Sequence, residues 1–140
     1  MIGKKQTDGT KNTKWLFGSY RRKLGTDGRV AIPKAWQHVL AKDLVLSLGP
    51  DGILELYPIA EWDKTARKMN REQYRDDRSL KMARKFFSLR EPVRADGQWR
   101  FVIPRSLRKD AKLGREIVLV SLGSRAEIWP AARWGKEFRI

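Results

Sequence analysis

The sequence predicts an α+β fold in which two β-rich units, carrying short helices and joined by a helical linker, interlock into one pseudo-symmetric domain. A β-rich pattern with the same turns and prolines occurs twice in 140 residues, at a period of 71 or 72 that depends on a two-residue difference in the second hairpin. The stretch between the copies has helical periodicity. Half of such a chain cannot bury a sufficient core alone, so the two copies are expected to interlock.

The two copies match at several points. Arg29-Val-Ala-Ile-Pro33 corresponds to Arg100-Phe-Val-Ile-Pro104, and Ser47-Leu48-Gly49 corresponds to Ser121-Leu122-Gly123. Further matches pair Glu55, Tyr57, Pro58 and Trp62 with Glu127, Trp129, Pro130 and Trp134. The expected organisation is a basic N-terminal tail over 1–14, a first unit over 15–63, a helical linker over 64–90 and a second unit over 91–140.

Each copy begins with an alternating strand that enters a turn, at 25–28 in the first copy and 95–98 in the second. A short strand follows and ends at Ile-Pro. Because proline is favoured where a helix begins, Pro33 and Pro104 each predict a short helix, and Gly114 is expected to end the second of these.

A hairpin follows in each copy. The first runs from 45–48 to 53–57 and turns at Pro50-Asp51-Gly52, and the second runs from 117–122 to 126–129. Turn residues between two apolar runs are typical of a β-hairpin. Pro58 and Pro130 then predict the start of another helix.

The linker is predicted to form two helices. One apolar stripe contains Ile59, Trp62, Ala66 and Met69, and the other contains Leu80, Ala83, Phe86 and Phe87. Asn70 with Gln73 is interpreted as the cap of the second helix. The opposite faces are rich in Arg and Lys, which is typical either of proximity to phosphates or of a solvated helix surface.

The charge balance points to polyanionic partners. Lys and Arg number 31 against 16 Asp and Glu, for a net charge of +15, and residues 30–58 form the near-neutral stretch between basic regions. Nucleic acid is the first expected partner and an acidic membrane the second, with a solubility surface as the plainer alternative. The apolar run 117–122 is too short to span a bilayer, so we expect a soluble, cytoplasmic protein.

The sequence does not predict an enzyme. The absence of cysteine excludes disulfides, thiolate nucleophiles and Cys-ligated zinc. His38 is the single histidine, and no phosphate-loop, dinucleotide or Gly-x-Ser-x-Gly fingerprint occurs. Asp76-Asp77 is surrounded by basic residues and is interpreted as salt bridging on a helix. We therefore expect no catalytic residues, no metal site, no cofactor and no small-molecule substrate.

The stretch Phe17-Gly-Ser-Tyr-Arg-Arg-Lys-Leu-Gly-Thr-Asp-Gly-Arg-Val-Ala-Ile-Pro33 carries a resemblance to a known family. It resembles the N-terminal segment of MraZ proteins, bacterial transcriptional regulators of the division and cell-wall gene cluster, built from two swapped-hairpin units of the AbrB type. The resemblance covers about residues 16–137. In this stretch the matching positions are Gly18, Tyr20, Leu24, Gly28, Arg29, Val30, Ile32 and Pro33.

Three positions depart from the family pattern. Gly25 replaces the Asp of the first turn, Asp27 replaces its Lys, and Trp99 stands where the second turn has Gly. If position 99 requires a positive φ, tryptophan is costly there, and the second loop is expected to have an altered shape. Asp27 is expected to weaken contact with phosphates.

The predicted DNA contacts centre on the first turn. Arg29 is the candidate base-edge reader, since a guanidinium suits bidentate contact with guanine, and a structural ion pair is the alternative role for it and for Arg100. Positioning on the backbone is assigned to the basic side chains of the first strand and to Lys34. The complete predicted set is Arg21, Arg22, Lys23, Thr26, Gly28, Arg29, Lys34, Arg100 and Arg105. Trp36, Trp62, Trp129 and Trp134 are expected in the core or an interface, whereas Trp99 either packs or stacks on a base.

The resemblance also implies partners. It implies double-stranded DNA and a homo-oligomer, in the family a closed ring that reads short direct repeats at the promoter of its own gene cluster. The expected location is the cytoplasm, in association with the nucleoid and without a membrane. The alternative function is an AbrB-type antitoxin that binds both DNA and a protein partner, and a nucleic-acid-processing enzyme is the third.

Overall fold

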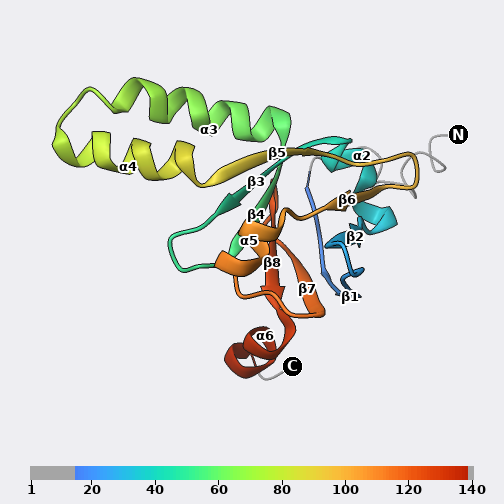
Figure 1. Cartoon of the computed structure of the whole chain (residues 1–140). Helices are drawn as coiled ribbons and strands as arrows, with labels where there is room; N and C mark the ends of the chain where they lie inside the picture. The colour runs from blue at the N-terminus through green and yellow to red at the C-terminus, as the bar shows by residue number, and fades with distance from the viewer. Residues whose placement is uncertain (1–14, 139–140) are drawn as a thin grey trace, which may run out of the picture.

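The computed structural model describes residues 15–138, so the predicted tail over 1–14 and the last two residues of the second unit lie outside the described residues. In chain order the elements are β1 Ser19–Lys23, β2 Arg29–Ala31, the 3₁₀ helix η2 Lys34–Trp36, α2 Gln37–Leu40, β3 Asp43–Leu48, β4 Leu54–Pro58, α3 Ile59–Glu72, α4 Asp77–Ser88, β5 Arg90–Arg94, β6 Arg100–Val102, α5 Arg105–Asp110, β7 Glu116–Ser121, β8 Ala126–Pro130 and α6 Ala131–Phe138 (Figure 1). No helix in this described part is long and apolar enough to cross a membrane.

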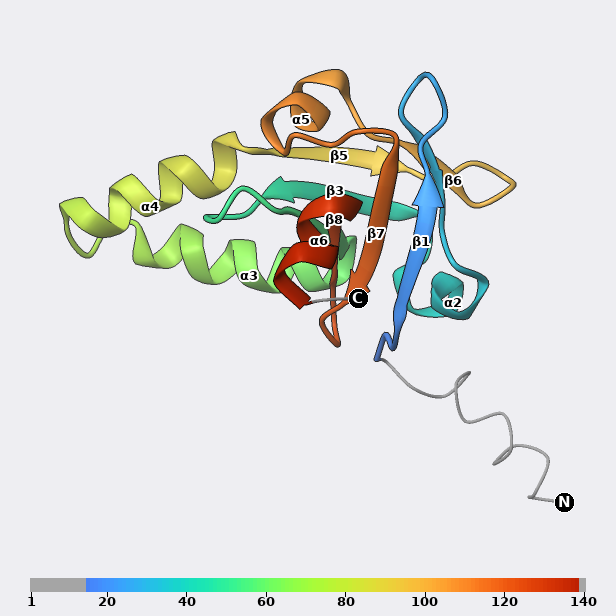
Figure 2. The ribbon, with the colours of Figure 1, turned by 90° about the horizontal axis from the view of Figure 1, so that it is seen from below.

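The strands form a six-stranded antiparallel sheet and a two-stranded ribbon. The sheet order is β1-β7-β8-β4-β3-β5, and the ribbon pairs β2 with β6. Strand β1 of the first copy therefore pairs with β7 of the second, and β5 of the second copy pairs with β3 of the first. Figure 2 shows β1 and β7 side by side. This exchange of edge strands confirms the predicted interlocking of two swapped-hairpin units in an α+β fold.

A pseudo-twofold relation follows from the strand registers. Glu55 lies opposite Glu127 where β4 meets β8, and Val30 lies opposite Phe101 at the centre of the ribbon. On either side of the Glu55–Glu127 pair, each strand of the sheet is matched by its equivalent from the other copy: β8 by β4, β7 by β3, and β1 by β5. The strand pairing and the equivalent backbone hydrogen bonds therefore assign counterparts between the paired segments of the two copies.

These registers correct two details of the predicted repeat. Ser47 lies opposite Glu55, whereas Val120, not Ser121, lies opposite Glu127, so the predicted Ser-Leu-Gly match is displaced by one residue. The two-residue difference lies before the second hairpin, not within it. Ala41 and Lys112 are counterparts with φ of 57° and 56°, and Leu113-Gly114 is then inserted before β7.

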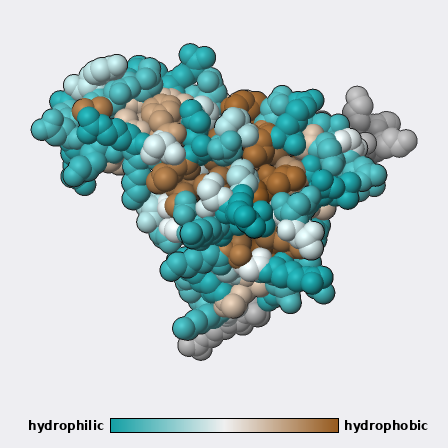
Figure 3. All heavy atoms as spheres, viewed as in Figure 1, coloured by the Kyte–Doolittle hydropathy of each residue, from teal (hydrophilic) through white to brown (hydrophobic). Residues whose placement is uncertain are grey.

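The main core lies between the sheet and the layer made by the ribbon and the short helices. Trp36, Leu107 and Phe101 are buried there with the inward side chains of the sheet. The Trp36 indole N–H donates to the Phe17 carbonyl oxygen at 2.8 Å. A smaller cluster on the opposite face of the sheet is covered by α6 through Trp134. Figure 3 shows apolar side chains gathered in the middle of a largely hydrophilic surface.

The linker helices α3 and α4 form a hairpin that projects from the β-rich body (Figure 1). The predicted stripes meet: Trp62 stacks on Phe86 with ring centroids 5.7 Å apart. The predicted cap is wrong, because α3 continues to Glu72 and Asn70 is inside it. Asp76 caps α4 instead, and its side chain accepts a hydrogen bond from the Ser79 N–H at 2.8 Å.

The prolines and glycine around the short helices differ slightly from expectation. Pro33 and Pro104 each occupy the residue before the first helical one, with φ of −53° and −55°. Gly114 does not end α5. The left-handed residue is Lys112, after which the Leu113 N–H donates to the Arg108 carbonyl oxygen at 2.9 Å, as in a Schellman-type helix end.

Candidate nucleic-acid interface

Two equivalent turns lead from the sheet into the ribbon: one connects β1 to β2, and the other connects β5 to β6. Residues 24–28 are called the first loop and residues 95–99 the second loop. In the first loop the Gly25 N–H donates to the Arg29 carbonyl at 2.9 Å. In the second loop the Asp96 N–H donates to the Arg100 carbonyl at 2.8 Å. Gly28 and Trp99 both adopt a positive φ, of 89° and 59°.

The second loop thus keeps the hydrogen bonds of the first, and the predicted change of shape is wrong. Trp99 does occupy a conformation that is costly for a residue with a β-carbon. Its ring compensates by packing against the main core, and the Lys42 ammonium lies 5.0 Å from the ring centroid.

Arg29 begins the ribbon directly after the first loop and forms an ion pair with Asp27. Asp27 Oδ1 accepts from the Arg29 backbone N–H at 3.1 Å, and Oδ2 lies 3.2 Å from Arg29 Nη2. The two side chains are 43% and 55% exposed, so the pair lies at the surface. Exposed pairs of this kind are weak, so another anion can compete with the Asp27 carboxylate for the Arg29 guanidinium.

Arg100 begins the other ribbon strand and is held by Asp96. Asp96 Oδ1 accepts from the backbone N–H groups of Gln98 and Arg100, at 2.8 and 3.0 Å. The N–H groups of Arg100 and Gln98 lower the pKa of Asp96, and the charges of Arg100 and Arg29 act in the same direction. The carboxylate that organises the turn therefore belongs to the first turn residue, Asp96, in the second loop but to the third turn residue, Asp27, in the first loop.

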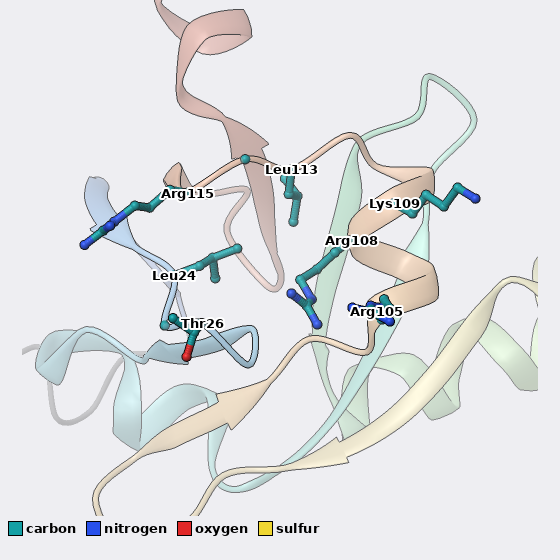
Figure 4. Close-up of a pocket in the computed structure, with 9 residues that line it drawn as sticks. Leu24, Thr26, Arg105, Arg108, Lys109, Leu113 and Arg115 are labelled. Atoms are coloured by element: carbon teal, nitrogen blue, oxygen red, sulfur yellow. The ribbon is translucent and has the colours of Figure 1, made fainter.

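A cleft separates the first loop from α5 (Figure 4). This cleft, called the α5 cleft, has a volume of about 750 Å³, and none of the described residues that line it is acidic. Figure 4 shows Arg108, Leu24 and Leu113 directed into it, while Lys109 and Arg115 extend away at its rims. Its lining consists of Leu24, Gly25, Thr26, Arg105, Arg108, Lys109, Leu113, Gly114 and Arg115.

Arg108 is fixed by the backbone beneath the first loop. Its Nε donates to the Ile103 carbonyl oxygen at 3.0 Å, and the Ile103 N–H donates to the Gly28 carbonyl oxygen at 2.9 Å. A side chain at Gly28 would collide with both groups, since its Cβ would lie 2.7 Å from Arg108 Nε and from the Ile103 oxygen. The cleft therefore requires glycine at position 28.

The first strand orients its basic residues as the alternation predicts. Arg21 and Lys23 are exposed, whereas Arg22 is half-buried on the other face beside Tyr20. The Arg22 guanidinium carbon lies 5.4 Å from the Tyr20 ring centroid.

The structure brings together only part of the predicted contact set. Thr26 and Arg105 lie at the α5 cleft beside Gly28. Lys34 lies elsewhere, because it begins η2, and the preceding Ile32 N–H donates to the Trp99 carbonyl oxygen of the second loop at 2.9 Å.

Sequence reasoning missed Arg108, Lys109 and Arg115. A signal was present, since Arg105, Arg108 and Lys109 are spaced three and four apart in the helix predicted after Pro104. In the described part of the chain, no three His, Cys, Asp or Glu side chains gather as metal ligands would.

Two hairpin units that exchange edge strands, each with an arginine at its turn, define the class of AbrB-type swapped-hairpin proteins. The chain belongs to the MraZ family. Residues 16–84 and 86–139 match the family model described as "MraZ protein, putative antitoxin-like".

Several curated proteins named transcriptional regulator MraZ are similar over most of their length. The protein of Halothermothrix orenii is 33% identical over 120 residues, which are 86% of this chain and 84% of that protein. That of Clostridium acetobutylicum is 31% identical over 119 residues, 85% of this chain and 84% of that protein. That of Pediococcus pentosaceus is 33% identical over 119 residues, 85% and 83%.

Proposed function

We propose that this chain is a sequence-specific transcriptional regulator that binds double-stranded DNA through its first loop. One observation carries the proposal. Arg29 is exposed at the start of a two-stranded ribbon, and the loop before it borders a cleft lined by four basic and no acidic described side chains. The names of the relatives, all transcriptional regulators, support the same function.

Arg29 is the proposed base-reading residue. A guanidinium on a rigid ribbon can donate two parallel hydrogen bonds to the O6 and N7 atoms of guanine in the major groove. Asp27 holds it at the surface until DNA replaces the carboxylate. The exposed Arg21 and Lys23, together with Thr26 and Arg105, would position the phosphate backbone.

Lys34 belongs with the second loop, and it would join the contact set only in a complex that also engages this loop. Arg100 lines one surface pocket together with Arg29 and Asp96, so it lies beside the proposed base-reading residue. Arg22 packs beside Tyr20, and its proposed role is to stiffen the strand that leads into the first loop.

Self-association is part of the proposal. Specific recognition of DNA typically buries about 1,000–2,500 Å² of protein surface, more than one loop of five residues offers. A homo-oligomer, in the form of a ring, would place several first loops along short direct repeats and gain affinity by avidity. The proposed target is the promoter of the chain's own division and cell-wall gene cluster, which implies a cytoplasmic, nucleoid-associated protein without a cofactor or catalytic activity.

Fluorescence anisotropy with the DNA upstream of the reading frame tests this function. A scrambled duplex of the same length and composition is the control. We expect tighter binding to the upstream duplex and a steep fall of log affinity with log salt concentration. Equal affinity for both duplexes would contradict sequence-specific regulation.

A further inference from the structure

The pseudo-twofold relation places an equivalent set of residues, called the counterpart of the α5 cleft, at the other end of the ribbon. There the second loop lies beside η2 and α2: the Ala95 N–H donates to the Lys42 carbonyl, as the Leu24 N–H donates to the Arg115 carbonyl at the first loop. Lys42 and Arg115 are therefore counterparts. The two ends share one backbone plan, so their side chains can be compared position by position.

The two ends differ in charge. Lys34 is the counterpart of Arg105, Gln37 of Arg108, and His38 of Lys109. These helical positions thus carry three cations beside the first loop, but one lysine, one amide and one histidine beside the second.

They differ in shape as well. The space beside Gly28 is occupied by the Arg108 guanidinium, whose carbon would lie 2.9 Å from a Cβ at that glycine. At the second loop the corresponding residue, Trp99, carries its own large ring, and the arginine is replaced by Gln37. The inserted Leu113-Gly114 also lines the α5 cleft and has no equivalent in the first copy. Three independent differences therefore distinguish the α5 cleft from its counterpart.

We propose that the α5 cleft holds a backbone phosphate of duplex DNA and that its counterpart at the second loop does not, so that each chain engages DNA through one end only. This inference rests on the proposed function and specifies which surface carries it. A phosphodiester suits the cleft because Arg105 and Arg108 supply charged donors, Thr26 supplies a hydroxyl, and no described acidic residue lines it. At the second end Lys42 lies over the Trp99 ring and the exposed Arg94 is paired with Asp43, which leaves Lys34 as the exposed cation of the short helices.

The matched variants Arg105→Ala and Lys34→Ala test the proposal in the full chain. Both side chains are exposed, and both residues follow the proline before a short helix. Affinity for the upstream duplex is measured by anisotropy over a series of salt concentrations. For Arg105→Ala we expect a slope of log affinity against log salt that is shallower by about 0.9 per engaged chain, and about fivefold weaker binding at 0.15 M salt. For Lys34→Ala we expect less than a third of the change in slope and less than a third of the change in log affinity.

A second pair keeps the test independent of folding defects. Arg108→Gln places the residue of the counterpart in the α5 cleft, and Gln37→Ala alters the counterpart itself. Thermal melting establishes that each variant is folded before its DNA affinity is compared. We expect Arg108→Gln to weaken binding at least fivefold and Gln37→Ala to change it less than twofold.

The outcomes separate this inference from the function on which it rests. Suppose that the wild type prefers the upstream duplex. The one-ended contact is then overturned if Arg105→Ala and Lys34→Ala lose affinity equally, and also if neither variant loses affinity. In both cases the regulator function would stand. A wild-type chain that shows no preference for the upstream duplex would overturn the function and the inference together.

Discussion

The side chain of Arg108 lies where a side chain at Gly28 would have to be. A Cβ on Gly28 would approach Arg108 Nε to 2.7 Å, and this nitrogen is held by the Ile103 carbonyl at 3.0 Å. Gly28 belongs to the first copy of the repeat and Arg108 to the second, so the position of the Arg108 side chain depends on the absence of a side chain in the other copy. Because copies exchange strands, a loop of the first copy and a helix of the second jointly form the candidate interface.

Gly28→Ala is expected to destabilise the fold. The residue has φ of +89°, and its new Cβ would meet the Ile103 backbone oxygen at 2.7 Å, which cannot move as a flexible side chain would. We expect a loss of about 2 kcal/mol or more in the free energy of unfolding, measured by urea denaturation. Gly97→Ala is the control, since a Cβ there meets no atom within 4 Å, and its change should stay within about 0.5 kcal/mol. Equal stabilities of the two variants would refute the close contact.

Asp27→Asn is expected to tighten DNA binding several-fold. The amide oxygen can still accept from the Arg29 N–H, while the negative charge that competes with phosphate for the Arg29 guanidinium is lost. An exposed pair of this kind contributes at most about 1 kcal/mol, so stability should change little. Anisotropy at a fixed salt concentration measures the gain. Unchanged or weaker affinity would show that Asp27 does not restrain Arg29.

Alkaline stability should depend on Tyr57. Its hydroxyl donates to Glu55 Oε1 at 2.9 Å, and burial, followed by the neighbouring Glu55, raises the pKa of Tyr57 to about 12 from 10.0. Between these two values the unfolded chain releases this proton and the folded chain keeps it, so the free energy of unfolding falls as the pH rises through that interval. Denaturant titrations from pH 9 to 12 should show a smaller decline for Tyr57→Phe than for the wild type. Parallel declines would remove Tyr57 from this account.

The cap of α4 offers a test of the corrected helix boundary. Asp76→Ala removes the acceptor for the Ser79 N–H and should lower the melting temperature. Asn70→Ala changes a residue inside α3 and should lower it less, because alanine suits a helix interior. A larger drop for Asn70→Ala would restore the boundary that the sequence predicted.

Much of the fold could be predicted because the sequence contains residues with strong local structural preferences. Pro33 and Pro104 directly precede the short helices, and the apolar stripe through Trp62 identifies the helical face that packs on Phe86. The strand register could not be predicted from the residue types alone. The two Ser-Leu-Gly stretches look identical, yet the register is set by which side chains face the core, and it displaces them by one residue.

The candidate interface was only half visible in the sequence. Arg29 follows a recognisable turn, and its exposure could be expected. The α5 cleft could not, because it depends on the exchange of strands that brings Arg108 of one copy under the first loop of the other. The prediction grouped Lys34 with the contacts around the first turn. In the structure the helix that begins at Lys34 lies beside the second loop instead.

The most direct test of the central claim compares the wild type with Arg29→Ala on the upstream and scrambled duplexes at one salt concentration. If Arg29 reads a guanine, its loss should cost about 1–3 kcal/mol in binding to the upstream duplex and bring the two affinities closer together. Loss of affinity for both duplexes in equal proportion would assign Arg29 to the phosphate backbone. An unchanged ratio of the two affinities would contradict base recognition by the first loop.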